Sequence, residues 1–253
     1  MSTRASNTEL YIFAISHYCE KARWALDWMN LEYDLKYLSP GPHVEATQKM
    51  GASASSLPLL IEREQVIQGS SAIIDWGESS SEGALGPAFQ NEAEKEEARL
   101  IEKRLDDRLG VHIRRYYYSE AMLDYPETVL PIFQEGLGTD DTATLASMWP
   151  FVRERMIESM DLGPAQREES RRIILEELDW VEAELSDGRP FFRGEQFSRI
   201  DLTAASLLAA LARPSEHPTY DDLGMPPKAT IDLAEWRDRP SMRWVRGLYR
   251  AHR

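Results

Sequence analysis

A short apolar run followed at once by a helical repeat limits what the start of this chain can fold into. Residues 9–14 (Glu-Leu-Tyr-Ile-Phe-Ala) are long enough for a buried strand and too short for a stable helix. From His17 to Asn30, apolar residues recur at steps of three and four, with Glu20 and Lys21 expected elsewhere on the surface. The sequence therefore predicts a strand that leads directly into an amphipathic helix.

Ser16 lies at the expected start of this helix. The first turn of a helix carries backbone N–H groups without intrahelical partners, and the aligned peptide dipoles add positive potential. An anion such as a thiolate is stabilised at such a place. Serine is also a preferred N-cap residue, because its hydroxyl satisfies one of these N–H groups. Both roles are open: an N-cap alone, or an N-cap that also binds a thiolate.

Three segments together resemble the amino-terminal domain of the cytosolic glutathione transferases, which is thioredoxin-like. They are residues 16–23 (Ser-His-Tyr-Cys-Glu-Lys-Ala-Arg), the pair Leu57-Pro58, and residues 70–73 (Ser-Ser-Ala-Ile). The first segment is similar to the serine-type motif of theta-like and zeta-like members and to the motif of omega-like members, which carry a reactive cysteine in place of the serine. It indicates a divergent, bacterial-type member. The resemblance implies glutathione as co-substrate and a homodimer. The scattered histidines and the single cysteine predict no metal.

The resemblance also implies roles for single residues. Ser16 falls at the position of the catalytic serine, and Cys19 at the second cysteine of a Cys-x-x-Cys pair whose first member is serine here. Pro58 would be the cis-proline, so that the backbone of Leu57 pairs with the cysteinyl part of glutathione. The other residues expected to bind glutathione are Ser70, Gln68 and Tyr18, and a solvent-facing ring is the alternative for Tyr18.

The chain departs from the pattern where the γ-glutamyl group would bind. Glutathione transferases usually carry Glu or Gln directly before the serine, whereas Gly69 precedes Ser70 here and Gln68 stands one place earlier. The stretch before Leu57 also lacks the basic residue often found there. Binding through other groups, such as His43 or Lys49, is therefore an alternative.

The second half of the chain contains an independent helix-start signal. In the segment 189–202, Ser198 and Asp201 form a Ser-x-x-Asp capping arrangement, and Phe197 and Leu202 flank it at hydrophobic-staple spacing. The pattern predicts a helix that begins after Ser198. Glutathione transferases carry a similar element in the core of their helical domain.

Helical patterns dominate the chain after residue 91. Good helix formers fill 91–122, an apolar repeat at steps of three and four runs from Ile174 to Leu185 before Asp187-Gly188, and a final helix is expected over 240–253. Less regular stretches are expected at 123–142 and after Ala212.

These patterns predict an α+β chain of two domains. We expect a thioredoxin-like α/β domain that binds glutathione over residues 1–80, a linker over 81–91, and an all-helical bundle over 92–253, as in the glutathione transferase fold. Tyr116 and Tyr117 lie on the first long helix of the bundle. In glutathione transferases this helix borders the acceptor pocket, which implies substrate contact, and a solvated or dimer-facing side is the alternative.

Composition and charge limit the compartment and the partners that we expect for this chain. At 253 residues and 42% apolar content, the chain can bury a sizeable core. One cysteine precludes an intrachain disulfide, and the start lacks an apolar signal region, so we expect a cytoplasmic protein. A net charge of −14 repels phosphate backbones, and no apolar run approaches a membrane span, so nucleic acid and membrane are not expected partners. The histidines have no metal-ligand spacing.

The leading functional hypothesis is an enzyme that conjugates or transfers glutathione to a small electrophile. Two alternatives stay open. One is a glutathione-dependent thiol reductase that uses Cys19, which requires an exposed, activated cysteine. The other is a non-catalytic protein of the same fold that binds or scaffolds.

Overall fold

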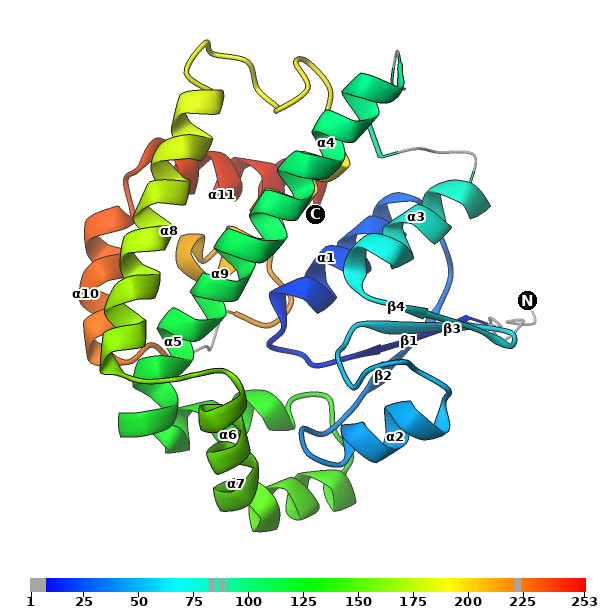
Figure 1. The fold of residues 1–253 in the computed structure, drawn as a ribbon, viewed down its shortest axis with the longest axis vertical. Helices are drawn as coiled ribbons and strands as arrows, with labels where there is room; N and C mark the ends of the chain where they lie inside the picture. Colours follow the sequence, from blue (N-terminus) through cyan, green and yellow to red (C-terminus); the bar gives the residue numbers. More distant parts are fainter. Residues whose placement is uncertain (1–7, 82–84, 87–88, 90, 221–223) are drawn as a thin grey trace. The chain divides into compact units, whose positions relative to one another are not determined.

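A computed structural model describes residues 8–81, 85, 86, 89, 91–220 and 224–253 (Figure 1). Contacts divide the chain into two compact units. The first comprises Met1–Ala84 and Leu130–Val152, and the second comprises Leu85–Val129 and Arg153–Arg253. The predicted linker is only partly covered, since residues 82–84, 87, 88 and 90 lie outside the described residues.

The first unit is built on a four-stranded mixed sheet of order β2-β1-β3-β4. Strand β1 runs parallel to β2 and antiparallel to β3, and β4 runs antiparallel to β3. Figure 1 shows α1 and α3 on one face of the sheet and α2 on the other. This thioredoxin-like arrangement confirms the predicted class of the first domain. The elements are β1 (Thr8–Ile12), α1 (His17–Trp28), β2 (Asp34–Tyr37), α2 (His43–Lys49), β3 (Leu59–Glu62), β4 (Gln65–Gln68) and α3 (Ser70–Ser80).

Helix α1 forms as the apolar repeat predicts, and its stripe packs into the core. Cys19, Ala22 and Leu26 are all at most 1% exposed, and Met29 forms the C-cap. The prediction for the other face was wrong in part. Glu20 and Lys21 are buried as well, and Lys21 bonds to Ser71 of α3, the helix that packs against α1.

Residues 130–152 group with the first unit although they lie far along the sequence. They belong to α6 (Pro126–Gln134) and α7 (Thr139–Ser159), so the expectation of an irregular stretch over 123–142 was wrong. Pro126 is the first residue of α6, where an N–H is not needed, and the helix continues through Pro131. The ring of Phe133 lies 6.3 Å from Phe13 and 6.0 Å from Trp149.

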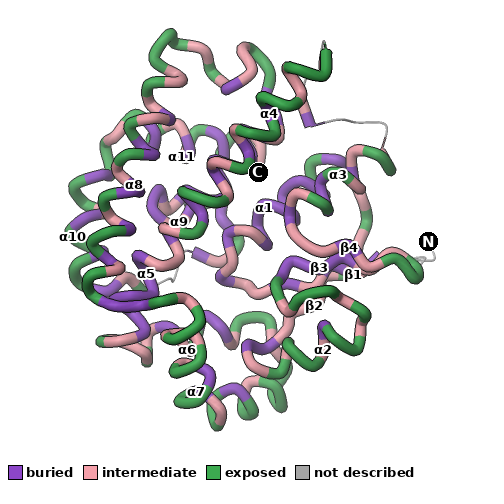
Figure 2. Tube along the Cα trace, viewed as in Figure 1, coloured by how far each residue is buried: buried purple, intermediate pink, exposed green. Residues whose placement is uncertain are grey.

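The second unit is a bundle of helices around α9, which is buried along almost its whole length (Figure 2). The predicted helix over 91–122 is present as α4, a π-helical turn η1, and α5 in succession. The predicted helices ending near Leu185 and Arg253 are also present, as α8 and α11. The bounds are α4 (Glu92–Arg104), η1 (Leu105–Gly110), α5 (Val111–Asp124), α8 (Pro164–Glu184), α9 (Arg199–Ala212), α10 (Pro227–Trp236) and α11 (Pro240–His252).

The predicted capping arrangement starts α9. The Asp201 carboxylate accepts hydrogen bonds from the Ser198 backbone N–H at 2.9 Å and from the Ser198 hydroxyl at 2.6 Å. It also accepts from the Phe192 N–H at 2.8 Å, so it fixes the preceding loop to the helix start. Burial raises the pKa of Asp201 to about 6. Phe197 and Leu202, at the staple positions, are both buried.

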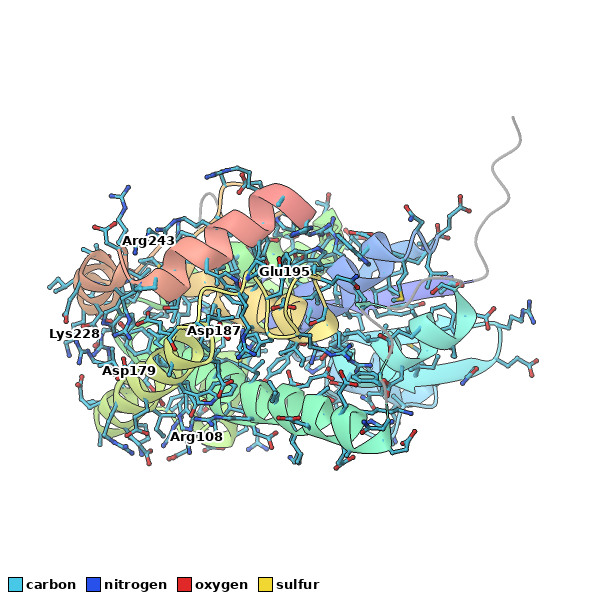
Figure 3. All side chains as sticks on the ribbon, turned by 90° about the horizontal axis from the view of Figure 1, so that it is seen from above. Arg108, Asp179, Asp187, Glu195, Lys228 and Arg243 are labelled. Atoms are coloured by element: carbon cyan, nitrogen blue, oxygen red, sulfur yellow. The ribbon has the colours of Figure 1, made fainter. Side chains whose placement is uncertain are left out.

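Charged side chains cover the outer helices of the second unit. Figure 3 shows Arg108, Asp179 and Arg243 among them, and all three are exposed. Within the part of the chain that the structure describes, no helix combines the length and the apolar character needed to cross a membrane.

Candidate active site

Three connections meet at one edge of the first unit's sheet because of the strand register. Tyr11 near the end of β1 pairs with Leu59 at the start of β3, and Leu59 pairs with Gln68 at the end of β4. Paired residues on neighbouring strands lie about 5 Å apart, so β1 and β4 end at the edge where β3 begins. The connections at this edge carry Ser16, Leu57-Pro58 and Ser70.

Ser16 is the N-cap of α1, as predicted. Its backbone is extended (φ −78°, ψ 116°), and its Oγ accepts a long hydrogen bond of 3.4 Å from the Cys19 N–H. The side chain is half-buried, so part of it faces the surroundings of the unit. The first-turn N–H groups and the helix dipole make this a place of positive potential.

Cys19 lies in the core of the first unit and is 1% exposed. Burial raises the pKa of its thiol to about 12, and hydrogen bonding by Ser16 offsets only part of that effect. The thiol is therefore protonated near neutral pH and shielded from solvent. This placement does not favour a thiol reductase that uses Cys19.

The peptide bond between Leu57 and Pro58 is cis, which confirms the conformation that the resemblance implies. The carbonyl of Pro58 accepts a hydrogen bond from the Gly69 N–H at 3.0 Å. This bond joins the start of β3 to the start of α3. Leu57 is 9% exposed, so its side chain helps to anchor the segment.

Helix α3 begins at Ser70, which is 6% exposed. Its N-cap is Gly69, with φ +93°, a conformation that glycine adopts without strain. The Nζ atom of Lys21 donates a hydrogen bond of 3.1 Å to the Ser71 Oγ, and Lys21 is fully buried. The start of α3 thus combines helix-end potential with a nearby ammonium group, and both favour an anion. Lys21 was not predicted from the sequence, because the helical repeat placed it on the surface.

The side chain of Gln68 bonds to the loop that precedes Leu57. Its Oε1 accepts from the Ala54 N–H and the Ser53 hydroxyl, both at 3.1 Å. Its Nε2 donates to the Ala54 carbonyl at 2.6 Å and to the Ser56 carbonyl at 2.9 Å. The neighbouring Gly69 has open space where a side chain would stand.

The other residues weighed in the first unit have local partners. His43 Nδ1 accepts from the Gly41 N–H at 3.0 Å, and burial lowers the pKa of His43, so it is mainly neutral at pH 7. Lys49 forms an exposed ion pair with Glu45 at 2.7 Å. Neither arrangement favours the alternative that His43 or Lys49 binds glutathione. The half-buried ring of Tyr18 lies 4.5 Å from that of His17.

Tyr116 and Tyr117 lie in the core of the second unit and use their hydroxyl groups there. Tyr116 donates to Asp232 at 2.7 Å, and Tyr117 donates to the Gly224 carbonyl at 2.9 Å. Their exposed fractions are 1% and 8%. Their predicted contact with an acceptor substrate stays a prediction, and this packing gives both residues a structural role.

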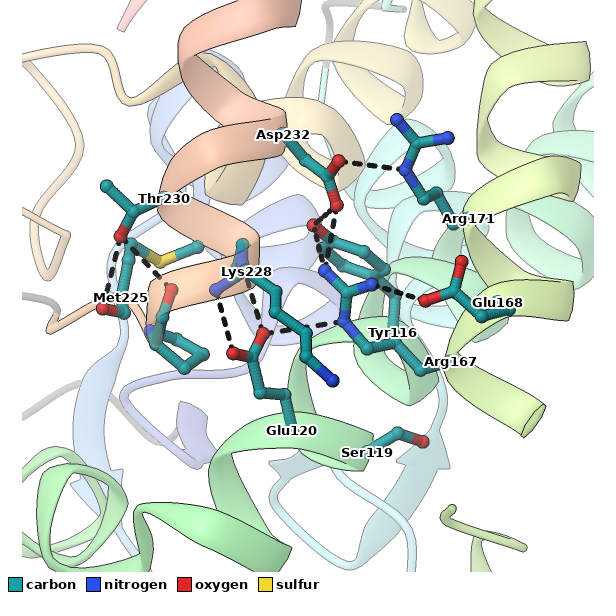
Figure 4. A network of polar contacts seen from close by, with 12 residues as sticks. Tyr116, Ser119, Glu120, Arg167, Glu168, Arg171, Met225, Lys228, Thr230 and Asp232 are labelled. Atoms are coloured by element: carbon teal, nitrogen blue, oxygen red, sulfur yellow. Dashed lines mark hydrogen bonds and ion pairs between the residues drawn. The ribbon is translucent and has the colours of Figure 1, made fainter. Parts of the chain in front are cut away.

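Tyr116 belongs to a buried polar network that joins α5, α8 and α10. The Arg167 guanidinium bonds to Asp232 at 2.8 Å and to the Tyr116 hydroxyl at 3.2 Å, and its Nε lies 3.4 Å from Glu120 (Figure 4). Glu120 in turn accepts hydrogen bonds from the N–H groups of Lys228 and Ala229, at the start of α10.

Comparison with known proteins agrees with this geometry. Residues 10–84 match the family model described as "Glutathione S-transferase, N-terminal domain". Solved glutathione S-transferases superimpose over almost the whole length of both chains. That of Ceriporiopsis subvermispora, in complex with glutathione, is 14% identical, covers 97% of each chain and gives a TM-score of 0.61. The chain has the glutathione transferase fold.

Further structures with this fold are similar to the same extent. The beta-etherase LigF from Sphingobium sp. strain SYK-6 is 17% identical, with a TM-score of 0.60, over 94% of this chain and 98% of that one. A glutathione S-transferase from Rhodospirillum rubrum F11 is 19% identical, with a TM-score of 0.58, over 94% of this chain and 91% of that one. No curated protein matches the chain in sequence.

Proposed function

We propose that this protein is a serine-type glutathione transferase that joins glutathione to a small electrophile. The observation that carries the proposal is the meeting of three connections at one sheet edge: Ser16 at the start of α1, the cis Leu57-Pro58 pair, and Ser70 at the start of α3. The family match over residues 10–84 and a similar structure that holds glutathione support the choice of ligand.

Ser16 would stabilise the glutathione thiolate. Its hydroxyl donates to the sulfur, while the first turn of α1 supplies positive potential. A hydrogen bond to a charged group contributes about 1.5 to 3 kcal/mol, which corresponds to a thiol pKa lowered by about 1 to 2 units. The thiol proton passes to water, and a sulfur lone pair then forms the bond to the electrophilic carbon, whose leaving group departs with the electron pair of the bond that breaks.

The remaining groups would orient the tripeptide. The backbone of Leu57 pairs with its cysteinyl residue, and the start of α3, with Ser70 and the buried Lys21 ammonium nearby, receives the γ-glutamyl carboxylate. We place the protein in the cytoplasm as a homodimer on the strength of its resemblance and composition.

Calorimetric titration with glutathione and a conjugation assay with a model electrophile test the proposal. We expect micromolar to low millimolar binding, and a Ser16→Ala variant that retains binding but conjugates about 10 to 100 times more slowly. Ser79→Ala is the matched control, because Ser79 is an exposed serine at the far end of α3. If glutathione does not bind, or if Ser16→Ala conjugates as fast as the parent, the proposal is wrong.

A further inference from the structure

The loop that leads into the cis Leu57-Pro58 pair has little packing of its own. Residues 52–56 read Ala-Ser-Ala-Ser-Ser, have no regular secondary structure, and carry only small side chains. Ser53, Ala54 and Ser56 are exposed. A segment of this kind loses much conformational entropy when it is ordered and buries little apolar surface in return. Something else must hold it in one conformation.

The Gln68 side chain supplies that constraint. It makes five hydrogen bonds to residues 12 to 15 positions earlier. Two are accepted by Oε1, from Ser53 and Ala54, and three are donated by Nε2, to the Ala54 carbonyl and to the carbonyl and hydroxyl of Ser56. Both the N–H and the carbonyl of Ala54 are therefore paired with one amide group, as in a strand ladder. Gln68 itself is fixed in β4 opposite Leu59.

We propose that Gln68 is a positioning residue that sets the backbone of Leu57 for the cysteinyl part of the thiol ligand. This inference rests on the proposed function. Each end of the loop is tied by one backbone bond, from the Ala52 N–H to the Thr47 carbonyl and from the Gly69 N–H to the Pro58 carbonyl. Gln68 fixes the middle of the loop. Because its Nε2 bonds to the Ser56 carbonyl, it sets the direction in which the backbone enters Leu57. The amide of Gln68 thus acts through the loop and does not contact the γ-glutamyl group.

The affinities for two ligands show whether Gln68 positions Leu57 or contacts the ligand directly. One is glutathione, and the other is its desamino analogue, in which hydrogen replaces the amino group of the γ-glutamyl residue. If Gln68 positions Leu57, the Gln68→Ala variant loses about tenfold in affinity toward both ligands. If Gln68 instead bound the amino group, the loss would fall on glutathione alone, and that result overturns the inference.

Two further variants make the comparison sharper. Gln68→Glu keeps the oxygen that accepts from Ser53 and Ala54, but it places a second oxygen against the Ala54 and Ser56 carbonyls, so we expect a loss larger than that of Gln68→Ala. Gln65→Ala is the matched control, because Gln65 is an exposed glutamine on the same strand. We expect its affinity for both ligands to equal that of the parent.

Steady-state kinetics distinguish a positioning role of Gln68 from a general loss of stability. Gln68→Ala raises KM for glutathione about tenfold, while kcat at saturating glutathione and KM for the electrophile stay within about twofold of the parent. Equal affinity and equal KM in parent and variant would overturn the inference.

Hydrogen exchange tests the role of Gln68 in the loop independently of glutathione binding. If the parent binds neither ligand, the proposed function fails, and amide exchange of residues 53–57 then tests the constraint by itself. Exchange at Ala54 should be at least tenfold faster in Gln68→Ala than in the parent and in Gln65→Ala. Unchanged exchange at Ala54 would show that Gln68 does not hold the loop.

Discussion

Two side chains at the start of α1 differ in burial although they are only three residues apart. Ser16 is half-buried at the N-cap, whereas Cys19 is 1% exposed in the core of the first unit. A hydroxyl at a helix start donates to a thiolate without changing its own charge. A thiol whose pKa burial raises to about 12 is almost fully protonated at neutral pH. We therefore assign the chemistry to the thiol of the ligand and not to the thiol of Cys19.

Cys19 should be inert in the native protein. We expect alkylation by iodoacetamide to be at least a hundredfold slower in buffer than in urea, because reaction requires unfolding to expose the thiol. Cys19→Ala should conjugate glutathione at the parent rate and lose about 1 kcal/mol of stability through the smaller buried side chain. Rapid alkylation of the folded protein, together with loss of activity in Cys19→Ala, would restore the reductase hypothesis.

At the scale of elements, the start of α9 links the loop at Phe192 to the core helix through one carboxylate. Asp201 is fully buried and accepts three hydrogen bonds. Burial raises its pKa from 3.8 to about 6, so the native state holds this proton more tightly than the unfolded chain does. The contribution of Asp201 to stability is thus greatest below about pH 4 and falls as pH rises toward 6, by up to about 3 kcal/mol.

Asp201→Asn tests this pH dependence. The amide does not titrate, so the difference in unfolding free energy between parent and variant should shrink between pH 4 and 6. The variant should also lose about 1 to 3 kcal/mol, because the Asn –NH2 group would face N–H donors. Ser198→Ala removes only the hydroxyl that donates to Asp201, and we expect it to lower the unfolding free energy by about 1 kcal/mol. A pH-independent difference between parent and Asp201→Asn would show that Asp201 is ionised throughout this range.

Local patterns explain which elements could be predicted. Helix α1 and the capped start of α9 follow from spacing and from residues within one or two turns of each other. Lys21 was misplaced because its burial depends on α3, some fifty residues later. The contacts of Gln68 depend on the fold of the 53–56 loop. Helix α6 was missed, and it contains Pro131, a residue that is unfavourable inside a helix. Pairings distant in sequence leave no periodic signal.

At the scale of the whole molecule, each unit has its own core and its own polar constraint. The second unit contains Arg167, 4% exposed, between Glu120 and Asp232, 2% and 10% exposed. Removing one partner of a buried ion pair leaves an uncompensated charge, which costs far more than losing an exposed pair. This network therefore matters for the position of α10 on α5 and α8.

Arg167→Met should lower the unfolding free energy of the second unit by about 3 to 5 kcal/mol, as measured by urea unfolding. Arg172→Met is the control, since Arg172 pairs with Glu176 on the exposed face of the same helix, α8. We expect it to cost less than about 1 kcal/mol. Equal effects of the two substitutions would mean that the network contributes no more than a surface pair.

The ionisation of bound glutathione shows whether Ser16 stabilises the thiolate. The ultraviolet absorbance of the thiolate, followed against pH with saturating glutathione, gives the pKa of the bound thiol in the parent and in Ser16→Ala. We expect a pKa in the parent at least 1 unit below the roughly 8.5 of a free thiol, and a pKa about 1 to 2 units higher in the variant than in the parent. A bound thiol that titrates like free glutathione in the parent, or equally in both proteins, would contradict this role of Ser16.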